Sequence, residues 1–246
     1  MAWSVRQCLR RALSEASHPD DSIWTAMTLR DAVKRVLRPL VPVPILMARH
    51  RNRQLRGRMQ ALEAWEERGW AAPSPPFVKR TVLRRYSLPS ATWIETGTFR
   101  GDTTAFLASF ARKVVTIEPE PAFFARARDR FCDEEAVEVV HGLSEVVLPL
   151  LLPSVRGPVC FWLDGHYSSP GTFRGPLETP VLEELAAIEA SIDRFDGVVV
   201  LIDDIRNFAG TTAKASYPSL DLVVDWSRRN RMQWHVEHDI LIARRD

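Results

Sequence analysis

The chain changes its pattern at residue 91, and this change constrains the fold more than any other feature. From there, short apolar runs alternate with stretches in which apolar residues recur at helical spacing. Strands are expected at residues 91–95, 113–118, 136–142, 158–164, 197–204, 231–237 and 239–245. Helices are expected between the first six of these strands, at residues 102–112, 122–131, 144–152, 179–192 and 219–230.

This alternation predicts an α/β fold with a mainly parallel sheet that is covered by helices on both faces. Runs such as VVVLI, residues 198–202, are apolar throughout, which is typical of strands buried on both faces. The last two strands have no helix between them. We therefore expect them to form an antiparallel hairpin at the edge of a seven-stranded sheet.

Residues 1–77 are expected to form a helical, basic extension before a domain at 78–246. Helical spacing is clear at residues 22–40 and 48–70, and the prolines of AAPSPPF predict a linker. Residues 1–86 carry a net charge of +10 and the rest a net charge of −8, which together give the +2 of the whole chain. The extension could bind an anionic surface, form a homodimer through its helices, or only present a solvated face.

Several classes of partner and location are disfavoured by the sequence. Aromatic residues are not interleaved with the basic ones, so we expect no nucleic acid partner. The most apolar early segment, LVPVPILMA, falls far short of the roughly 20 residues that a membrane span needs, and no signal peptide is visible. Three cysteines show no pairing or metal-like spacing and are expected to be buried free thiols. These features predict a cytoplasmic location.

Carboxylates stand at the ends of most of the expected strands. In an open α/β sheet, ligands bind beyond the carboxyl ends of the strands, so these positions are candidate site residues. Four of the first five strands end in, or just before, an acid: Glu95, Glu118, Asp164, and the pair Asp203 and Asp204. Because buried strand ends do not tolerate unpaired charge, each acid is expected to have a specific partner.

The turn ETGTFRGDTT, residues 95–104, favours a particular kind of ligand. Gly97 and Gly101 would let a ligand approach the backbone, and the amides of the following helix would face it. The turn lacks the three-glycine spacing that a pyrophosphate favours, but it permits a nucleoside with a zwitterionic tail, whose ammonium Glu95 could face. Glu118, about 20 residues further on, could accept hydrogen bonds from ribose hydroxyls, or could be a salt-bridged surface acid.

A second group of acids predicts a metal site. Asp164, Asp203 and Asp204 are hard oxygen donors, which suit Mg²⁺ or Mn²⁺. Alternatively, one of them caps a helix or pairs with Arg206. His166, two residues beyond Asp164, could be a general base, a further ligand or an ordered loop residue.

The segments ETGTFRGDTT, TIEPE, HGLSEVV, FWLDGHYSS, TPVLEEL and VLIDDIRNF resemble, in order and spacing, class I S-adenosylmethionine-dependent methyltransferases. The closer likeness is to bacterial sugar and small-molecule O-methyltransferases, and it covers about residues 78–246. It implies a Rossmann-like sheet and S-adenosyl-L-methionine as cofactor. By this resemblance Glu95, Gly97, Thr98 and Gly101 hold the methionine part, Glu118 the ribose and Ser144 the adenine edge, with Thr103 and Asp164 among the cofactor contacts.

Two departures from related enzymes matter. The sequence is similar, more distantly, to metal-dependent catechol-type enzymes, in which Asp164, Asp203 and Asp204 would match the metal positions. Those enzymes have a lysine near the first metal aspartate, where this chain reads DGHYSSPGTFRG. This disfavours a catechol acceptor and makes His166 the better candidate for the base. Leu143 stands where many relatives have an acid that touches adenine.

The expected reaction is methyl transfer to a hydroxyl of a sugar, polysaccharide or related natural product, assisted by a divalent metal. His166 would remove the proton beside Asp164, and Tyr167 and Arg174 would contact the acceptor. One alternative is a non-catalytic binding module that recruits a partner or membrane through its basic helices. Another is a nicotinamide-dependent oxidoreductase, which the two-glycine turn disfavours.

Overall fold

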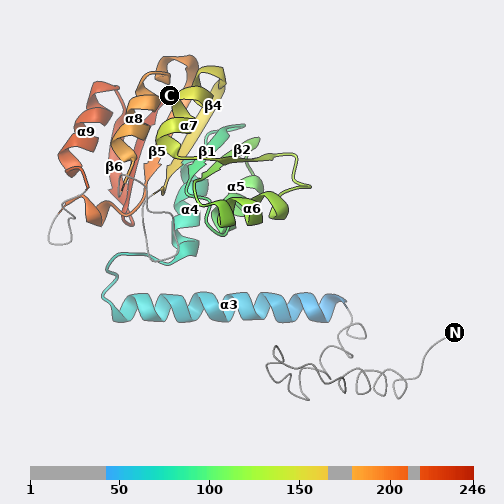
Figure 1. Ribbon diagram of the computed structural model, residues 1–246. Coiled ribbons are helices and arrows are strands. Elements are labelled where there is room, and N and C mark those ends of the chain that lie inside the picture. Colours follow the sequence, from blue (N-terminus) through green and yellow to red (C-terminus); the bar gives the residue numbers. More distant parts are fainter. Residues whose placement is uncertain (1–42, 166–178, 210–216) are drawn as a thin grey trace, which may run out of the picture. The chain divides into compact units, whose positions relative to one another are not determined.

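The computed structural model describes residues 43–165, 179–209 and 217–246 of the chain (Figure 1). The chain divides into two compact units, residues 1–63 and 64–246, and the boundary falls inside helix α3, Val43–Glu67. The helix expected at residues 22–40 lies outside the described residues. None of the helices in the described ranges combines the length and the apolar composition that crossing a membrane requires.

The second unit is built on one seven-stranded sheet in the order β3-β2-β1-β4-β5-β7-β6. Strands β1 to β5 run parallel, and β7 is antiparallel to both of its neighbours, β5 and β6. The α/β fold, with its Rossmann-like parallel sheet and antiparallel edge hairpin, is therefore confirmed. The strands are β1 Thr92–Thr96, β2 Lys113–Glu118, β3 Val137–His141, β4 Gly157–Leu163, β5 Phe195–Ile202, β6 Gln233–Glu237 and β7 Ile240–Arg245.

Helices cover both faces of the sheet (Figure 1). Because successive side chains of a strand point to opposite faces, Trp93 and Ile94 of β1 enter two different hydrophobic clusters. The Trp93 cluster is completed by α4 and α5, and the Ile94 cluster by α7, α8 and α9. The helices are α4 Pro76–Tyr86, α5 Asp102–Ala108, α6 Pro121–Arg130, α7 Ser144–Leu151, α8 Val181–Glu189 and α9 Leu220–Arg229, with short 3₁₀ turns at Leu152–Ser154, Ile192–Arg194 and Ile205–Asn207.

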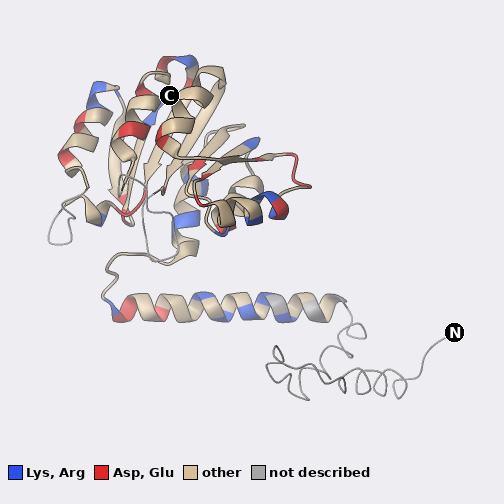
Figure 2. Cartoon of the chain, viewed as in Figure 1, with Lys and Arg blue, Asp and Glu red and all other residues tan. Residues whose placement is uncertain are grey.

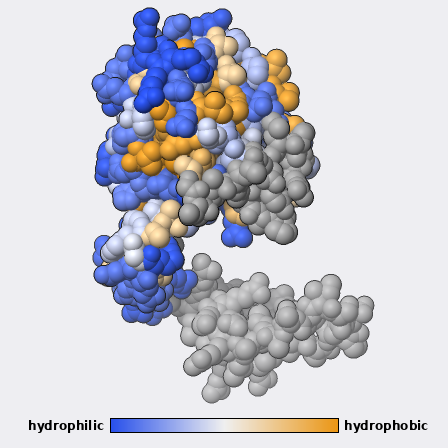
Figure 3. Space-filling view, turned by 90° about the vertical axis from the view of Figure 1, so that its left-hand side faces the viewer, coloured by the Kyte–Doolittle hydropathy of each residue, from blue (hydrophilic) through white to orange (hydrophobic). Residues whose placement is uncertain are grey.

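The described surface differs between α3 and the sheet unit. Arginines are spread along α3, whereas acidic residues lie on many elements of the second unit (Figure 2). Apolar residues gather on the side of the second unit that Figure 3 shows.

Of the two cysteines in the described ranges, Cys160 is a buried free thiol as expected, but Cys132 is exposed because it lies in the turn after α6. Cys8 lies outside those ranges.

Candidate active site

The strand order itself locates the candidate site. From β1 the chain runs outward to β2 and β3, and it then returns to place β4 on the other side of β1. The loops after β1 and β4 therefore lead to helices on opposite faces of the sheet. In open α/β sheets this change of direction opens the crevice in which ligands bind, at the carboxyl ends of the strands. The turn after Thr96 and the loop that begins at Asp164 meet at this point.

The two glycines of the turn are required by contacts within the protein. Gly97 has φ of 86°, and a Cβ added there would lie 2.7 Å from the main-chain oxygen of Asp164. Gly101 has φ of 74°, and its Cβ would lie 2.7 Å from the ring of Phe131. Positive φ and close approach both favour glycine. What approaches each glycine here is protein, and the contact of either one with a cofactor stays a prediction.

Glu95 lies buried at the centre of a hydrogen-bond network beneath the turn. Its Oε2 accepts from the hydroxyls of Thr104 at 2.5 Å and Thr116 at 2.7 Å. The Thr98 hydroxyl lies 2.6 Å from that of Thr116 and donates to it, because Thr116 already donates to Glu95. Burial raises the pKa of Glu95 to about 7, against the lowering effect of the two threonine hydroxyls. The network joins β1, β2, the turn and α5.

Glu118 holds the turn in place from the end of β2. The main-chain N–H of Phe99 donates to its Oε2 at 2.7 Å, and that of Glu120 donates to its Oε1 at 2.9 Å. Phe99 has φ of 49°, a conformation that a bulky residue rarely adopts without support. Burial raises the pKa of Glu118, and the two N–H donors oppose the rise. Each carboxylate oxygen keeps a lone pair that a ribose hydroxyl could use.

A group of aromatic rings lies beside Glu118. This group was not predicted from the sequence. The Phe99 ring packs on Phe123 with centroids 4.7 Å apart, and Phe124 stacks on His141 at 4.7 Å. Phe99 is 43% exposed, so an edge of this group is open to solvent. No spacing rule signals the group, because its members come from the turn, from α6 and from β3. The predicted Ser144 is buried at the start of α7, and the predicted Thr103 is half-buried in α5.

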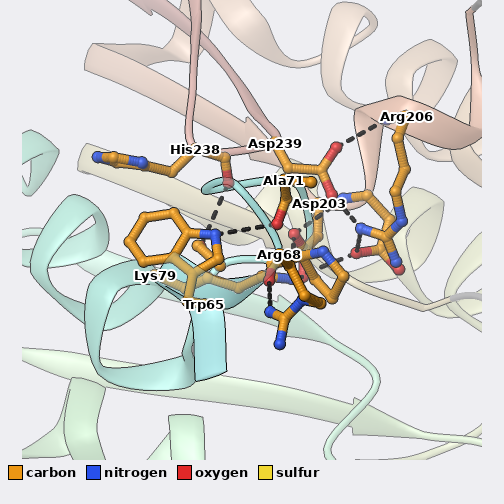
Figure 4. Close-up of polar contacts among 11 residues, drawn as sticks. Trp65, Arg68, Ala71, Lys79, Asp203, Arg206, His238 and Asp239 are labelled. Atoms are coloured by element: carbon orange, nitrogen blue, oxygen red, sulfur yellow. Dashed lines mark hydrogen bonds and ion pairs between the residues drawn. The ribbon is translucent and has the colours of Figure 1, made fainter. Parts of the chain in front are cut away.

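Asp203 and Asp204, two of the predicted metal ligands, are paired with protein cations. Figure 4 labels Asp203, Lys79 and Arg206 among the polar contacts that it draws. The Nζ of Lys79 lies 2.7 Å and 2.5 Å from the two carboxylate oxygens of Asp203, and 3.2 Å from Oδ1 of Asp204. Arg206 donates to the same Oδ1 of Asp204 at 2.8 Å and also pairs with Asp239. The alternative prediction, that one aspartate pairs with Arg206, is therefore confirmed for Asp204.

The carboxylates of Asp203 and Asp204 keep Lys79 positively charged. Burial alone would lower the pKa of its ammonium group, but the carboxylates of Asp203 and Asp204 outweigh this effect and hold the pKa above its usual value. The carboxylate of Asp164 acts in the same direction, so all three predicted metal ligands act on the Lys79 ammonium. Lys79 lies 124 residues before Asp203 in the sequence and was not predicted as a site residue.

A small pocket opens beside Asp203, between the ends of β4 and β5 and helix α8. Gly165 lies at its wall, and a Cβ there would approach the Thr96 hydroxyl oxygen to 3.1 Å and Oε1 of Glu184 to 3.4 Å. The pocket thus combines apolar walls with buried polar groups. Its lining includes Leu163, Gly165, Val181, Glu184, Asp203 and Tyr217.

Three predicted residues, His166, Tyr167 and Arg174, lie outside the described residues. In the described ranges, no three His, Cys, Asp or Glu side chains are grouped so as to hold a metal ion. The structure does bring Glu95, Gly97, Thr98, Gly101 and Glu118 together around one turn, and the main chain of Asp164 packs against that turn.

Comparison with known proteins gives matches of structure only. No family model matches the chain, and no curated protein matches its sequence. An O-methyltransferase from Bacillus cereus, solved in complex with SAH, is 16% identical, covers 76% of this chain and 88% of its own, and gives a TM-score of 0.49. An rRNA methylase from Streptococcus thermophilus is 17% identical, and the match covers 71% of this chain and 97% of the methylase chain with a TM-score of 0.41. Both of these structures are of methyltransferases, and at this level of similarity neither assigns an activity to this chain.

Proposed function

We propose that this protein is an S-adenosylmethionine-dependent methyltransferase that acts on a hydroxyl group. One observation carries the proposal: buried Glu118 fastens the glycine turn through the N–H of Phe99 at the point where the strand order changes direction. A carboxylate at that place can receive ribose hydroxyls. The resemblance of the sequence motifs to class I methyltransferases supports the same conclusion.

The residues around the turn fit this cofactor. Glu118 would hold the ribose through the remaining lone pairs of its two oxygens, and Ser144 would lie at the adenine edge. Glu95, Gly97, Thr98, Gly101 and Thr103 would surround the methionine part, where the buried Glu95 carboxyl offers a counter-charge for an ammonium group. When bound, the cofactor supplies a methyl group on a sulfonium centre, which is already electrophilic. The protein then has to align the acceptor and exclude water.

The acceptor side of the proposal places a sugar, polysaccharide or related natural-product hydroxyl beyond β4 and β5. Buried polar groups of Glu184 and Tyr217 lie on this side of the sheet, in the lining of the small pocket beside Asp203, which as it stands is too small to hold a sugar. His166 would take the acceptor proton next to Asp164, and Tyr167 and Arg174 would contact the acceptor. A cytoplasmic location and a homodimer through the N-terminal helices are parts of the same proposal.

Divalent metal assistance does not fit the site residues as they are arranged. The oxygens of Asp203 and Asp204 that would bind Mg²⁺ or Mn²⁺ already face the ammonium of Lys79 and the guanidinium of Arg206. A cation added there would meet two like charges at hydrogen-bonding distance from its own ligands. The proposed mechanism therefore contains no step through a metal ion.

Calorimetric titration with S-adenosylhomocysteine tests the cofactor assignment. We expect the purified protein to bind it, with Mg²⁺ and with EDTA alike, and Glu118→Gln to bind about tenfold more weakly because one ribose acceptor becomes a donor. Glu138→Gln, on the neighbouring strand and exposed, is the matched control and should bind like the unchanged protein. Absence of binding to the unchanged protein, with and without candidate acceptors, would favour a non-catalytic binding module.

The assignment of the base is tested separately. His166→Ala is expected to keep its affinity for S-adenosylhomocysteine and to lose most of its turnover, because proton removal is a step that the sulfonium does not supply. Turnover measured against an acceptor identified by screening sugars and polyols would decide this. A variant with nearly unchanged turnover would remove His166 from the mechanism.

A further inference from the structure

The ion pair between Lys79 and the acidic residues after β5 is buried. The side chain of Lys79 is 18% exposed, and that of Asp203 is 4% exposed. The ammonium group has three protons, and three carboxylate oxygens lie between 2.5 Å and 3.2 Å from its nitrogen. Its donor capacity is thus matched by Asp203 and Asp204. Such an arrangement differs from a solvent-exposed surface pair, which contributes little.

The packing of α4 sets the position of Lys79. Val82 and Leu83 follow Lys79 by three and four residues, so all three lie on one face of the helix. Val82 and Leu83 are each 1% exposed in the cluster beneath β1 and β4. The side chain of Lys79 is therefore directed along the sheet, and its stem reaches the carboxyl end of β5.

The segment before α4 is also fixed to the same end of the sheet. The Ser74 hydroxyl donates to the main-chain oxygen of His238 at 3.5 Å, and Trp65 packs edge-on against the His238 ring (Figure 4). Arg206 joins the β6–β7 turn to the cluster, because it pairs with both Asp204 and Asp239. The start of α4, from which the Lys79 side chain reaches Asp203 and Asp204, is therefore held in place.

Two protein cations already lie beside the acid pair where a metal would bind. Lys79 pairs with Asp203 and Asp204, and Arg206 pairs with Asp204 while it also pairs with Asp239. Mg²⁺ needs near-octahedral oxygen ligands at about 2.0–2.1 Å, which Nζ at 2.5 Å from Asp203 prevents without displacement of the lysine.

We propose that Lys79 is the resident cation of this acid pair and takes the place that a divalent metal ion would fill. The acceptor is then held without chelation, so a substrate with a single isolated hydroxyl is as acceptable as a vicinal diol. Asp203 also lines the pocket beside α8, so Lys79 fixes the charge and orientation of a pocket wall. This consequence for the acceptor rests on the proposed function, whereas the metal-binding behaviour does not.

Mn²⁺ titration followed by electron paramagnetic resonance tests the proposal on the full chain. We expect Lys79→Met, which removes the charge and keeps the length, to bind Mn²⁺ at least about tenfold more tightly than the unchanged protein. Adding Asp203→Asn should abolish that gain, and Lys79→Arg should bind Mn²⁺ like the unchanged protein. Lys113→Met is the matched control, because Lys113 pairs with Glu138 at 2.6 Å at the opposite end of the strands.

Two results would overturn the proposal. The first is tight Mn²⁺ binding by the unchanged protein that is lost in Asp203→Asn, because the metal then displaces Lys79. The comparison of the unchanged protein with Asp203→Asn tests the proposal even if Lys79→Met does not fold. The second is a folded Lys79→Met protein, judged by near-ultraviolet circular dichroism, that binds Mn²⁺ no better than the unchanged protein. Failure of S-adenosylhomocysteine to bind would remove the proposed function and leave the Mn²⁺ comparison valid.

Discussion

Glu95→Gln is expected to stabilise the ligand-free protein by about 3 kcal/mol at about pH 8, and by less than about 1 kcal/mol at about pH 5. The reason is the burial of the Glu95 carboxyl, which raises its pKa from 4.5 to about 7. Glutamine keeps a carbonyl oxygen that can accept from the hydroxyls of Thr104 and Thr116, and it carries no charge to bury.

The direction of the pH effect follows from proton binding. Because the pKa is higher in the folded state, the native protein binds more protons than the unfolded chain between pH 4.5 and about 7. The stability that protonated Glu95 contributes is therefore complete below pH 4.5 and is lost as the pH rises to about 7. This direction is opposite to that of a salt-bridged carboxylate, whose pKa is lowered.

Urea unfolding followed by tryptophan fluorescence at several pH values measures this effect. The difference between Glu95→Gln and the unchanged protein isolates Glu95 from other groups that titrate in the same range. Glu189→Gln, an exposed position on α8, is the control and should show no pH-dependent difference. A difference for Glu95→Gln that stays constant from about pH 5 to about pH 8 would contradict the buried, raised-pKa carboxyl.

The elements of the sheet unit could be predicted from the sequence because their signals are local. Each expected strand from β1 to β7 is present within about two residues. Strands β1, β2, β4, β5 and β7 are buried by the clusters on the two faces, whereas β3 and β6, at the two edges of the sheet, are partly or mostly exposed. The helix expected at 102–112 ends at Ala108, however. The main-chain N–H groups of Phe110 and Ala111 both donate to the main-chain oxygen of Leu107. The N–H of Arg112 donates to the main-chain oxygen of Ala91 as the chain turns toward β2.

The partners of the site residues could not be predicted, because tertiary packing sets them. Acids at the strand ends were evident from the sequence, and Glu118 is buried at the end of β2. Lys79 reaches Asp203 only because Val82 and Leu83 fix α4 against the sheet. Likewise, Ser74 lies in a proline-rich stretch that predicted a linker, yet its side chain is buried against the β6–β7 turn.

Gly97→Ala is expected to destabilise the protein by about 3 kcal/mol and to abolish most of its affinity for S-adenosylhomocysteine. Two costs add at this position. Alanine is strained at φ of 86°, and its Cβ would lie 2.7 Å from the main-chain oxygen of Asp164 and 3.3 Å from the Cα of Gly165. Because these are backbone atoms of the β4 loop, the clash is relieved only if the β1 turn and that loop move apart.

Gly157→Ala separates the cost of backbone strain from the cost of the steric clash. Gly157 has φ of 85°, nearly the value at Gly97, but an added Cβ would meet no atom within 4 Å. We expect this control to lose only about 1 kcal/mol from backbone strain and to keep its affinity for S-adenosylhomocysteine. Urea unfolding and calorimetric titration of both variants measure the comparison. Equal losses of stability, with affinity retained in both, would mean that contact between the β1 turn and the β4 loop does not shape the site. A larger loss in Gly97→Ala, accompanied by lost affinity, would place the cofactor at this junction, where the strand order changes direction.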